Sequence, residues 1–208
     1  PHAMFRSELT LDQYLNSPLV ADPIRLYDCV MPCAGAEAFL VMREETAREN
    51  GLPYVHLLGA IERHNAFADD PIQERGGWAA DRDDLFAQAG ISHDQIDFVE
   101  AYDDYPIIIF LQLEDLGFCG KGEARSFVQE NDLTNAGSFP LNTSGGQLSV
   151  GQAGAAGGYL GLVEAIRQLS DQALGGQVPD ARFGLVSGFG MINYDRGLST
   201  GAAVLAAA

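Results

Sequence analysis

A glycine-rich stretch that runs into an amphipathic one constrains this chain more than any other feature. The stretch reads Pro-Leu-Asn-Thr-Ser-Gly-Gly-Gln-Leu-Ser-Val-Gly-Gln-Ala-Gly-Ala-Ala-Gly-Gly from Pro140 to Gly158. Glycine permits backbone dihedrals and close approaches that a β-carbon forbids. Apolar residues then recur at three- and four-residue steps, namely Ala156, Leu160, Val163, Ile166 and Leu169. The pattern predicts a close-contact loop that opens onto a helix N-terminus, where free amide groups favour an oxyanion or an anionic ligand.

Composition limits the classes of partner. The 208 residues include 12 basic and 29 acidic ones, for a net charge of -17. Nonspecific binding to nucleic acid or to an anionic membrane needs clusters of Lys and Arg, and the chain has none. We therefore expect neither partner and interpret the acidity as a solvated surface, with an acidic patch for a basic partner as the alternative.

Cysteine usage and the absence of long apolar runs indicate a compartment. The three cysteines are too few and too irregular for a disulfide framework or a zinc site. No apolar run approaches the roughly 20 residues of a membrane span. These features predict a cytoplasmic protein. The chain does not begin with Met and its first residues resemble the middle of a longer pattern, so we expect a fragment whose N-terminal half lies outside this sequence.

The hydrophobic pattern predicts alternating strands and helices. Strands are expected at 36–42, 54–62, 97–102, 183–187 and 199–207, and helices at 43–50, 84–90, 106–117 and 156–169. Residues 63–82 read as an irregular excursion anchored by Trp78, and residues 119–139 as a polar connection. Asp103 or Asp104 is expected to cap the helix that begins at Pro106. The order predicts an α/β domain with a layered mixed sheet and helices on both faces.

Three turns at strand ends are candidates for chemistry, because ligand sites of α/β sheets gather there. They contain Tyr102, Gln152 and residues 187–190. Tyr102 can donate a hydrogen bond to an oxyanion, or act as a general acid or base if its pKa is shifted. The alternatives left open are a tyrosine packed at a strand end and aspartates that only cap a helix.

Other reactive side chains lack the neighbouring residues that a catalytic site requires. The four histidines do not cluster, so no metal site is expected. Cys119 has no histidine near it in sequence and reads as a buried small hydrophobe. Ser144 and Ser187 lack the pattern of a nucleophile elbow, and the glycine loop matches neither a Walker motif nor a dinucleotide fingerprint.

Four motifs follow one another along the chain: Ile24–Cys29 with Ala34–Ala38, Glu100–Tyr105, Leu113–Glu123 and Asn142–Gly146. Taken in this order, they resemble the C-terminal half of the thiolase superfamily, in the branch related to sterol carrier protein X and the steroid side-chain aldolases. The resemblance implies a thiolase-like fold in which residues 1–50 end the N-terminal domain and residues 51–208 form the C-terminal domain. It implies a substrate carried by coenzyme A, no covalently bound cofactor, and a homodimer or heteromer.

The sequence departs from the thiolase pattern at its catalytic positions. Gln152 stands where the resemblance places the Gly-His-Pro histidine, and Val186 stands where it places the second cysteine. Tyr102 replaces an Asn or His, as in the related aldolases, which cleave β-hydroxyacyl-CoA and work with a small OB-fold, zinc-bearing partner. Those aldolases carry a second tyrosine at the position of Gln152.

The sequence therefore predicts a thiolase-like protein that makes or breaks a carbon–carbon bond of an acyl-CoA, by retro-aldol chemistry or acyl transfer. Tyr102 and Gln152 are the candidate catalytic residues. The candidate substrate-binding residues are Ser144, Gly145, Gly146, Ser187 and Gly188. The alternative is a non-catalytic acyl-CoA or lipid binder, or an assembly subunit of the same family.

Overall fold

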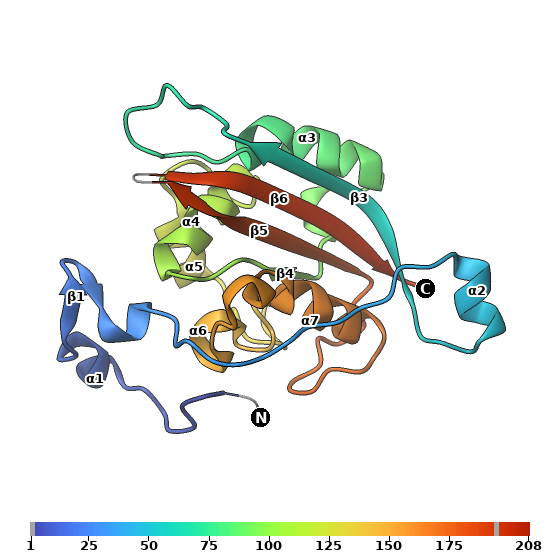
Figure 1. Cartoon of the computed structure of the whole chain (residues 1–208), viewed down its shortest axis with the longest axis horizontal. Coiled ribbons are helices and arrows are strands. Elements are labelled where there is room, and N and C mark those ends of the chain that lie inside the picture. The colour runs from blue at the N-terminus through green and yellow to red at the C-terminus, as the bar shows by residue number, and fades with distance from the viewer. Residues whose placement is uncertain (1–2, 194–195) are drawn as a thin grey trace.

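The structure is a computed structural model that describes residues 3–193 and 196–208. Its centre is a four-stranded mixed sheet in the order β3-β6-β5-β4, shown in Figure 1. The strands are β3 (Val55–His64), β4 (Phe98–Glu100), β5 (Phe183–Asn193) and β6 (Arg196–Ala207). β6 pairs antiparallel with both β3 and β5, while β4 runs parallel to β5. The predicted α/β class with a mixed sheet is confirmed.

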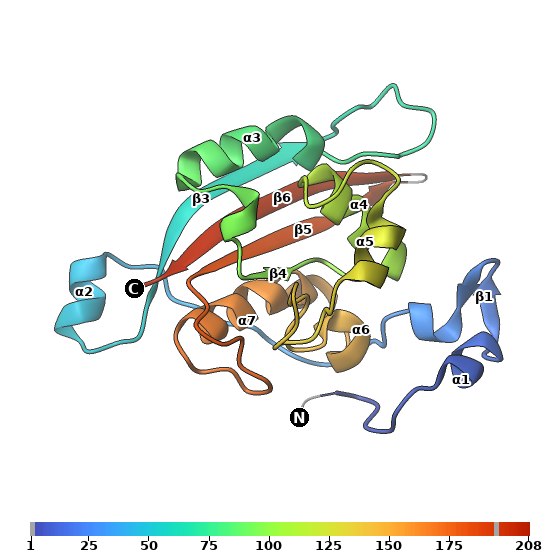
Figure 2. The ribbon, with the colours of Figure 1, turned by 180° about the vertical axis from the view of Figure 1, so that it is seen from behind.

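Helices cover both faces of this sheet because each strand presents buried apolar residues to both faces in alternation. Val99, Leu185 and Val204 face a core built on α3 (Trp78–Ala89) and α4 (Pro106–Asp115). Their chain neighbours Phe98, Val186 and Leu205 face the opposite core, under α7 (Leu160–Leu169). A period of two puts successive side chains on opposite faces, so both faces are buried. Figures 1 and 2 show α3 and α7 on opposite sides of the strands.

The N-terminal segment lies outside these layers. It contains α1 (Leu11–Leu15), the hairpin of β1 (Leu19–Ala21) and β2 (Ile24–Arg25), and α2 (Glu44–Glu49). Thr10 caps α1 by accepting a hydrogen bond from the backbone N–H of Gln13. In Figure 1 the segment after β2 passes along α6 and α7 before it reaches α2. This path brings residues 31–33 next to the glycine-rich loop.

Several helix ends follow local rules read from the sequence. Gly90 and Gly117 have φ angles of 69° and 88°, which a helix stop requires and which cost glycine least. Pro106 occupies the first turn of α4, where its missing N–H is not needed. Trp78 is fully buried, donates from Nε1 to the carbonyl oxygen of Gly201 at 2.8 Å and stacks on Phe189. The predicted anchor role of Trp78 is confirmed.

Other expectations about local structure were wrong. α3 begins at Trp78, six residues before the expected start at Asp84. Two short helices interrupt segments expected to be irregular: α5 (Ala124–Glu130) and α6 (Gly146–Val150). Residues 187–190 form no turn, because β5 continues to Asn193 in register with β6. The link between β5 and β6 was expected at Asn193–Gly197, which includes residues outside the described ranges.

The apolar run at 36–42 also differs from its predicted state. It is extended but forms no strand in the described structure, and Leu40 and Val41 are 79% and 88% exposed. A strand needs backbone partners on a neighbouring chain segment, and none of the described segments offers them here. The described residues contain no helix long and apolar enough to cross a membrane.

Candidate functional site

The turn after β4 places Tyr102, and a buried glutamine on α4 fixes its backbone. Gln112 is fully buried; its Oε1 accepts from the Tyr102 N–H at 3.0 Å and its Nε2 donates to the Tyr102 carbonyl at 2.7 Å. The same Oε1 accepts from the hydroxyl of Ser187 at 2.6 Å. The sequence did offer a signal for Gln112, a lone polar residue within the apolar run from Pro106 to Leu113.

The glycine-rich loop places Gln152 against the N-terminal segment. The N–H of Gln152 donates to the carbonyl of Met31 at 2.8 Å, and the N–H of Cys33 donates to the carbonyl of Gln152 at 3.0 Å. Gly151 has a φ angle of 92°, and a β-carbon there would lie 2.9 Å from Cys33 Sγ and 3.0 Å from the Met31 oxygen. A glycine is therefore required where the two segments meet.

Three side chains meet at this place. Nε2 of Gln152 donates to the hydroxyl oxygen of Tyr102 at 3.0 Å and to Oδ1 of Asp104. All three side chains remain partly exposed. Burial raises the pKa of Tyr102 to about 12, and the charge of Asp104 and a hydrogen bond to it act in the same direction. Partial burial also raises the pKa of Asp104, against the effect of its hydrogen bonds to Tyr102 and Gln152.

The structure assigns different partners to the two aspartates that were expected to cap α4. The residue before α4 is Tyr105, and its side chain makes no capping hydrogen bond to that helix. Asp103 is 3% exposed and accepts from the backbone N–H groups of Gln147 and Leu148, at 2.8 and 3.2 Å. It therefore caps α6, forty-four residues away along the chain.

The contact of Asp103 with α6 explains why glycines occupy positions 145 and 146. Gly145 and Gly146 have φ angles of 96° and 63°, and a β-carbon on Gly146 would lie 2.0 Å from Oδ2 of Asp103. The glycines let the first turn of α6 sit directly on the carboxylate of Asp103. The first amide groups of α6 are thus taken by a carboxylate of the chain itself, whereas the anion site was predicted at the start of the later helix, α7.

Tyr102 faces a surface hollow of about 380 Å³ beside α7 and the strands β5 and β6. Val186, Ser187 and Gly188 line it as well. Two of the three predicted turns therefore contribute to one hollow, and the third lies next to it through the contact of Gln152 with Tyr102. Val186 is 9% exposed and offers no group that can exchange a proton or act as a nucleophile.

Ser144 lies at a second hollow, of about 320 Å³, which is also lined by Cys33, Gly151, Glu164 and Arg167. The hydroxyl oxygen of Ser144 is shielded from solvent and has no hydrogen-bond partner among the described residues. An unpaired buried hydroxyl is uncommon and costs free energy, so it marks a place where a polar ligand atom would be favourable.

Two buried glutamates lie behind the site. The Thr143 hydroxyl lies 2.6 Å from Oε1 of Glu100 and 3.0 Å from Oε1 of Glu164, and both glutamates are 2% exposed. One hydroxyl proton can serve only one of these contacts, so the other contact requires a proton on a carboxyl group. Burial raises the pKa of Glu100 to about 8, with the hydrogen bonds from Thr143 opposing the shift.

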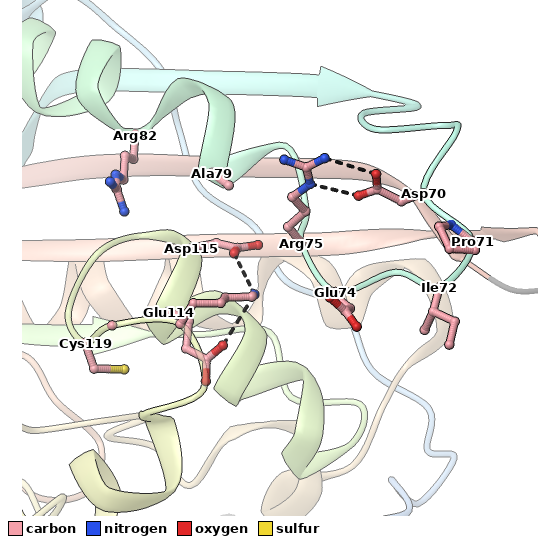
Figure 3. A pocket seen from close by; sticks show the side chains of 12 residues that line it. Asp70, Pro71, Ile72, Glu74, Arg75, Ala79, Arg82, Glu114, Asp115 and Cys119 are labelled. Atoms are coloured by element: carbon pink, nitrogen blue, oxygen red, sulfur yellow. Dashed lines mark hydrogen bonds and ion pairs between the residues drawn. The ribbon is translucent and has the colours of Figure 1, made fainter.

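A further hollow, of about 740 Å³, is a separate feature that the sequence did not predict. Figure 3 shows Asp115 and Glu114 on one side of it and the Arg75–Asp70 ion pair on the other. Lys121 forms ion pairs with both Glu114 and Asp115, so these two carboxylates of the hollow have a cationic partner. Burial raises the pKa of Cys119, which lines this hollow, to about 11, so its thiol is protonated at neutral pH.

Comparisons with known proteins give a family match. A family model described as "Thiolase C-terminal domain-like" matches residues 62–200. The chain is 29% identical to benzoylsuccinyl-CoA thiolase subunit BbsB of Thauera aromatica, over 86% of the chain and 47% of that protein. It is 32% identical to a steroid side-chain-cleaving aldolase of Thermomonospora curvata, over 80% of the chain and 44% of that protein.

A solved structure shares the fold. The Ltp2-ChsH2(DUF35) aldolase superposes with a TM-score of 0.77 and 26% identity, covering 96% of this chain and 51% of that one. The chain thus spans about half the length of the relatives it matches. Because the family model covers most of the chain and the fold agrees, this protein belongs to the thiolase superfamily and contains its C-terminal domain.

Proposed function

We propose that this chain is the C-terminal half of a thiolase-like enzyme that makes or breaks the carbon–carbon bond next to the thioester of an acyl-CoA. Tyr102 is the acid–base group, and Gln152 donates a hydrogen bond to the oxygen that becomes negative. The observation that carries this proposal is the contact of the two side chains at 3.0 Å beside a hollow that Tyr102 lines.

The chemistry of the side chains favours retro-aldol cleavage, or its reverse, over thiolysis. Gln152 donates hydrogen bonds but exchanges no proton near neutral pH, and Val186 has no thiol. Tyr102, unlike Gln152 and Val186, can both donate a hydrogen bond and exchange a proton. A retro-aldol step on a β-hydroxyacyl-CoA needs a proton acceptor for the hydroxyl group and no cysteine nucleophile.

Five residues are proposed to shape the substrate pocket, with coenzyme A as part of the substrate and no other cofactor. Gly188 and Ser187 line the Tyr102 hollow. The unpaired hydroxyl of Ser144 is suited to a polar group of the substrate. Gly145 and Gly146 act through α6, which they hold against Asp103.

We place residues 1–50 with the N-terminal domain and residues 51–208 in the C-terminal domain. Four consecutive apolar residues, 39–42, are 38–88% exposed, which supports their burial against a part of the protein beyond this chain. The relatives include a thiolase subunit and a two-component aldolase. They support a homodimer or heteromer, with a small OB-fold, zinc-bearing protein as the proposed partner.

Replacement of Tyr102 tests the proposal. In the complete protein, Tyr102→Phe should abolish cleavage of β-hydroxyacyl-CoA thioesters while the far-UV spectrum and melting temperature stay close to the wild type. Tyr27→Phe, at an exposed tyrosine far from the turn after β4 in sequence, is the matched control. Unchanged turnover by Tyr102→Phe would sink the assignment.

The second candidate function is a non-catalytic acyl-CoA binder or assembly subunit. The amide at position 152 and the valine at position 186 favour it, because neither supports thiolase chemistry. Turnover of a panel of β-hydroxyacyl-CoA thioesters, with and without the partner protein, separates the two candidates. Binding of coenzyme A thioesters without turnover in either arm selects the binder.

A further inference from the structure

Asp104 contacts both candidate catalytic residues, yet the proposed function assigns it no role. We infer that Asp104 is the proton acceptor of the site and acts through the hydroxyl group of Tyr102. This inference rests on the proposed function and specifies where the proton of the substrate goes. It makes Asp104 a proton acceptor and a positioning residue, while Tyr102 is the group that touches the substrate.

Contacts on both sides hold the Tyr102–Asp104 pair in place. Gln112 binds the backbone N–H and C=O of Tyr102, and α6 binds the carboxylate of Asp103. The residues before Asp104 are thus fixed from two directions. The amide of Gln152 then donates one hydrogen to the Tyr102 oxygen and the other to Oδ1 of Asp104.

One amide group places the Tyr102 hydroxyl beside the carboxylate of Asp104. Nε2 of Gln152 donates both to the Tyr102 oxygen and to Oδ1 of Asp104, so these two oxygens lie around the same nitrogen. In the proposed order, Gln152 donates to the Tyr102 oxygen and the Tyr102 hydroxyl donates to Asp104. A proton that reaches Tyr102 from the hollow can displace the tyrosine proton onto Asp104.

Other groups around Tyr102 are unsuited to accept that proton. Asp103 is buried and already accepts two backbone N–H groups. Gln147 and Gln152 are amides, and the hydroxyl of Ser187 donates to Gln112. Asp104 is partly exposed, carries a carboxylate and shares the amide donor of Gln152 with the Tyr102 hydroxyl. Among the described residues it is the group whose chemistry and position fit.

The step balances without any further reactant. The β-hydroxyl group of the substrate gives its proton to the Tyr102 oxygen, while the Tyr102 proton moves to Asp104. The bond between the α- and β-carbons breaks, the β-carbon becomes a carbonyl, and the electron pair forms the enolate of the thioester. Asp104 then returns its proton through Tyr102 to the α-carbon. The products are an aldehyde or ketone and a shortened acyl-CoA.

Asp104→Asn tests the inference, because it keeps the shape of the side chain and removes the carboxylate. In the complete protein, kcat for β-hydroxyacyl-CoA cleavage should fall about 10²- to 10³-fold, the range typical of lost acid–base catalysis. KM should change by less than about threefold, since acyl-CoA contacts remain. The acidic limb of the kcat–pH profile should disappear, and Asp104→Glu should restore part of kcat. Asp83→Asn, at a side chain that is 90% exposed, is the matched control.

A readout without turnover separates this inference from the proposed function. Loss of the carboxylate should lower the pH at which Tyr102 ionises. This titration is measured as the part of the tyrosinate absorbance that Tyr102→Phe lacks. An unchanged Tyr102 titration in Asp104→Asn overturns the inference even if the protein is an aldolase. A wild-type acidic limb in Asp104→Asn, with Tyr102→Phe inactive, overturns it as well but leaves the proposed function standing. Inactive wild-type protein on the whole panel overturns the proposed function itself.

Discussion

The side-chain amide of Gln152 lies 3.0 Å from the hydroxyl oxygen of Tyr102, although fifty residues separate the two positions in the sequence. The contact closes a gap between the turn after β4 and the glycine-rich loop. It puts a hydrogen-bond donor beside a phenol that lines this hollow and can exchange a proton. Substitutions at these two residues therefore test the proposed site most directly.

Removal of the amide should weaken catalysis without unfolding the domain. Gln152→Ala is expected to lower kcat about 10²-fold, comparable to the loss of one oxyanion donor. The side chain is partly exposed, so the unfolding free energy should change by less than about 1 kcal/mol. Steady-state kinetics and urea denaturation of the complete protein measure both quantities. Gln172→Ala, at an exposed glutamine, is the control, and equal kcat values for the two variants would contradict the prediction.

Tyr102 should ionise at a higher pH than an ordinary tyrosine. Its pKa is raised to about 12 by burial, by the charge of Asp104 and by a hydrogen bond to it. The phenol therefore stays protonated, and able to donate, throughout the neutral and mildly alkaline range. The difference in tyrosinate absorbance between wild-type protein and Tyr102→Phe reports this titration. A Tyr102 midpoint near pH 10 would show that burial and Asp104 do not act on the phenol as described.

Glu100 should make the protein less stable as pH rises. Its folded pKa of about 8 lies above the value of an exposed glutamate, so the folded state holds a proton that the unfolded state has released. Stability from this group is complete below the unfolded pKa and is lost as pH rises toward 8, with a slope of at most about 1.4 kcal/mol per pH unit. Glu100→Gln should flatten the dependence of melting temperature on pH between 5 and about 8. Glu130→Gln, at an exposed glutamate, should leave the wild-type slope intact.

Two neighbouring glycines should respond differently to the same substitution. A β-carbon on Gly157 would lie 2.2 Å from Oε1 of Gln147 and 3.0 Å from Cγ of Gln152, whereas a β-carbon on Gly158 meets nothing within 4 Å. Gly157→Ala should therefore cost about 1–3 kcal/mol through overpacking. Gly158→Ala should change the unfolding free energy by less than about 1 kcal/mol. Chemical denaturation of the pair measures the difference, and equal losses would refute the packing argument.

Local features of the fold can be read along the chain. The apolar pattern of residues 183–187 and 199–207 locates two paired strands, although β5 continues to Asn193, and Gly90, Pro106 and Gly117 mark the ends of helices. These features depend on residues within a few positions of each other, so propensity and period suffice to predict them. The resemblance to thiolases likewise singled out Tyr102 and Gln152, because motif positions can be read along the chain.

The partners of the polar groups depend on how distant segments pack in the folded protein. Asp103 caps α6 instead of α4, Asp104 meets Gln152, and Gln112 fixes the backbone of Tyr102. A buried carboxylate or amide takes whichever donors the folded chain brings to it, and those lie forty to fifty residues away for the two aspartates. The apolar run at 36–42 illustrates the same limit. Its composition predicts a strand, but a strand forms only where another segment supplies backbone partners.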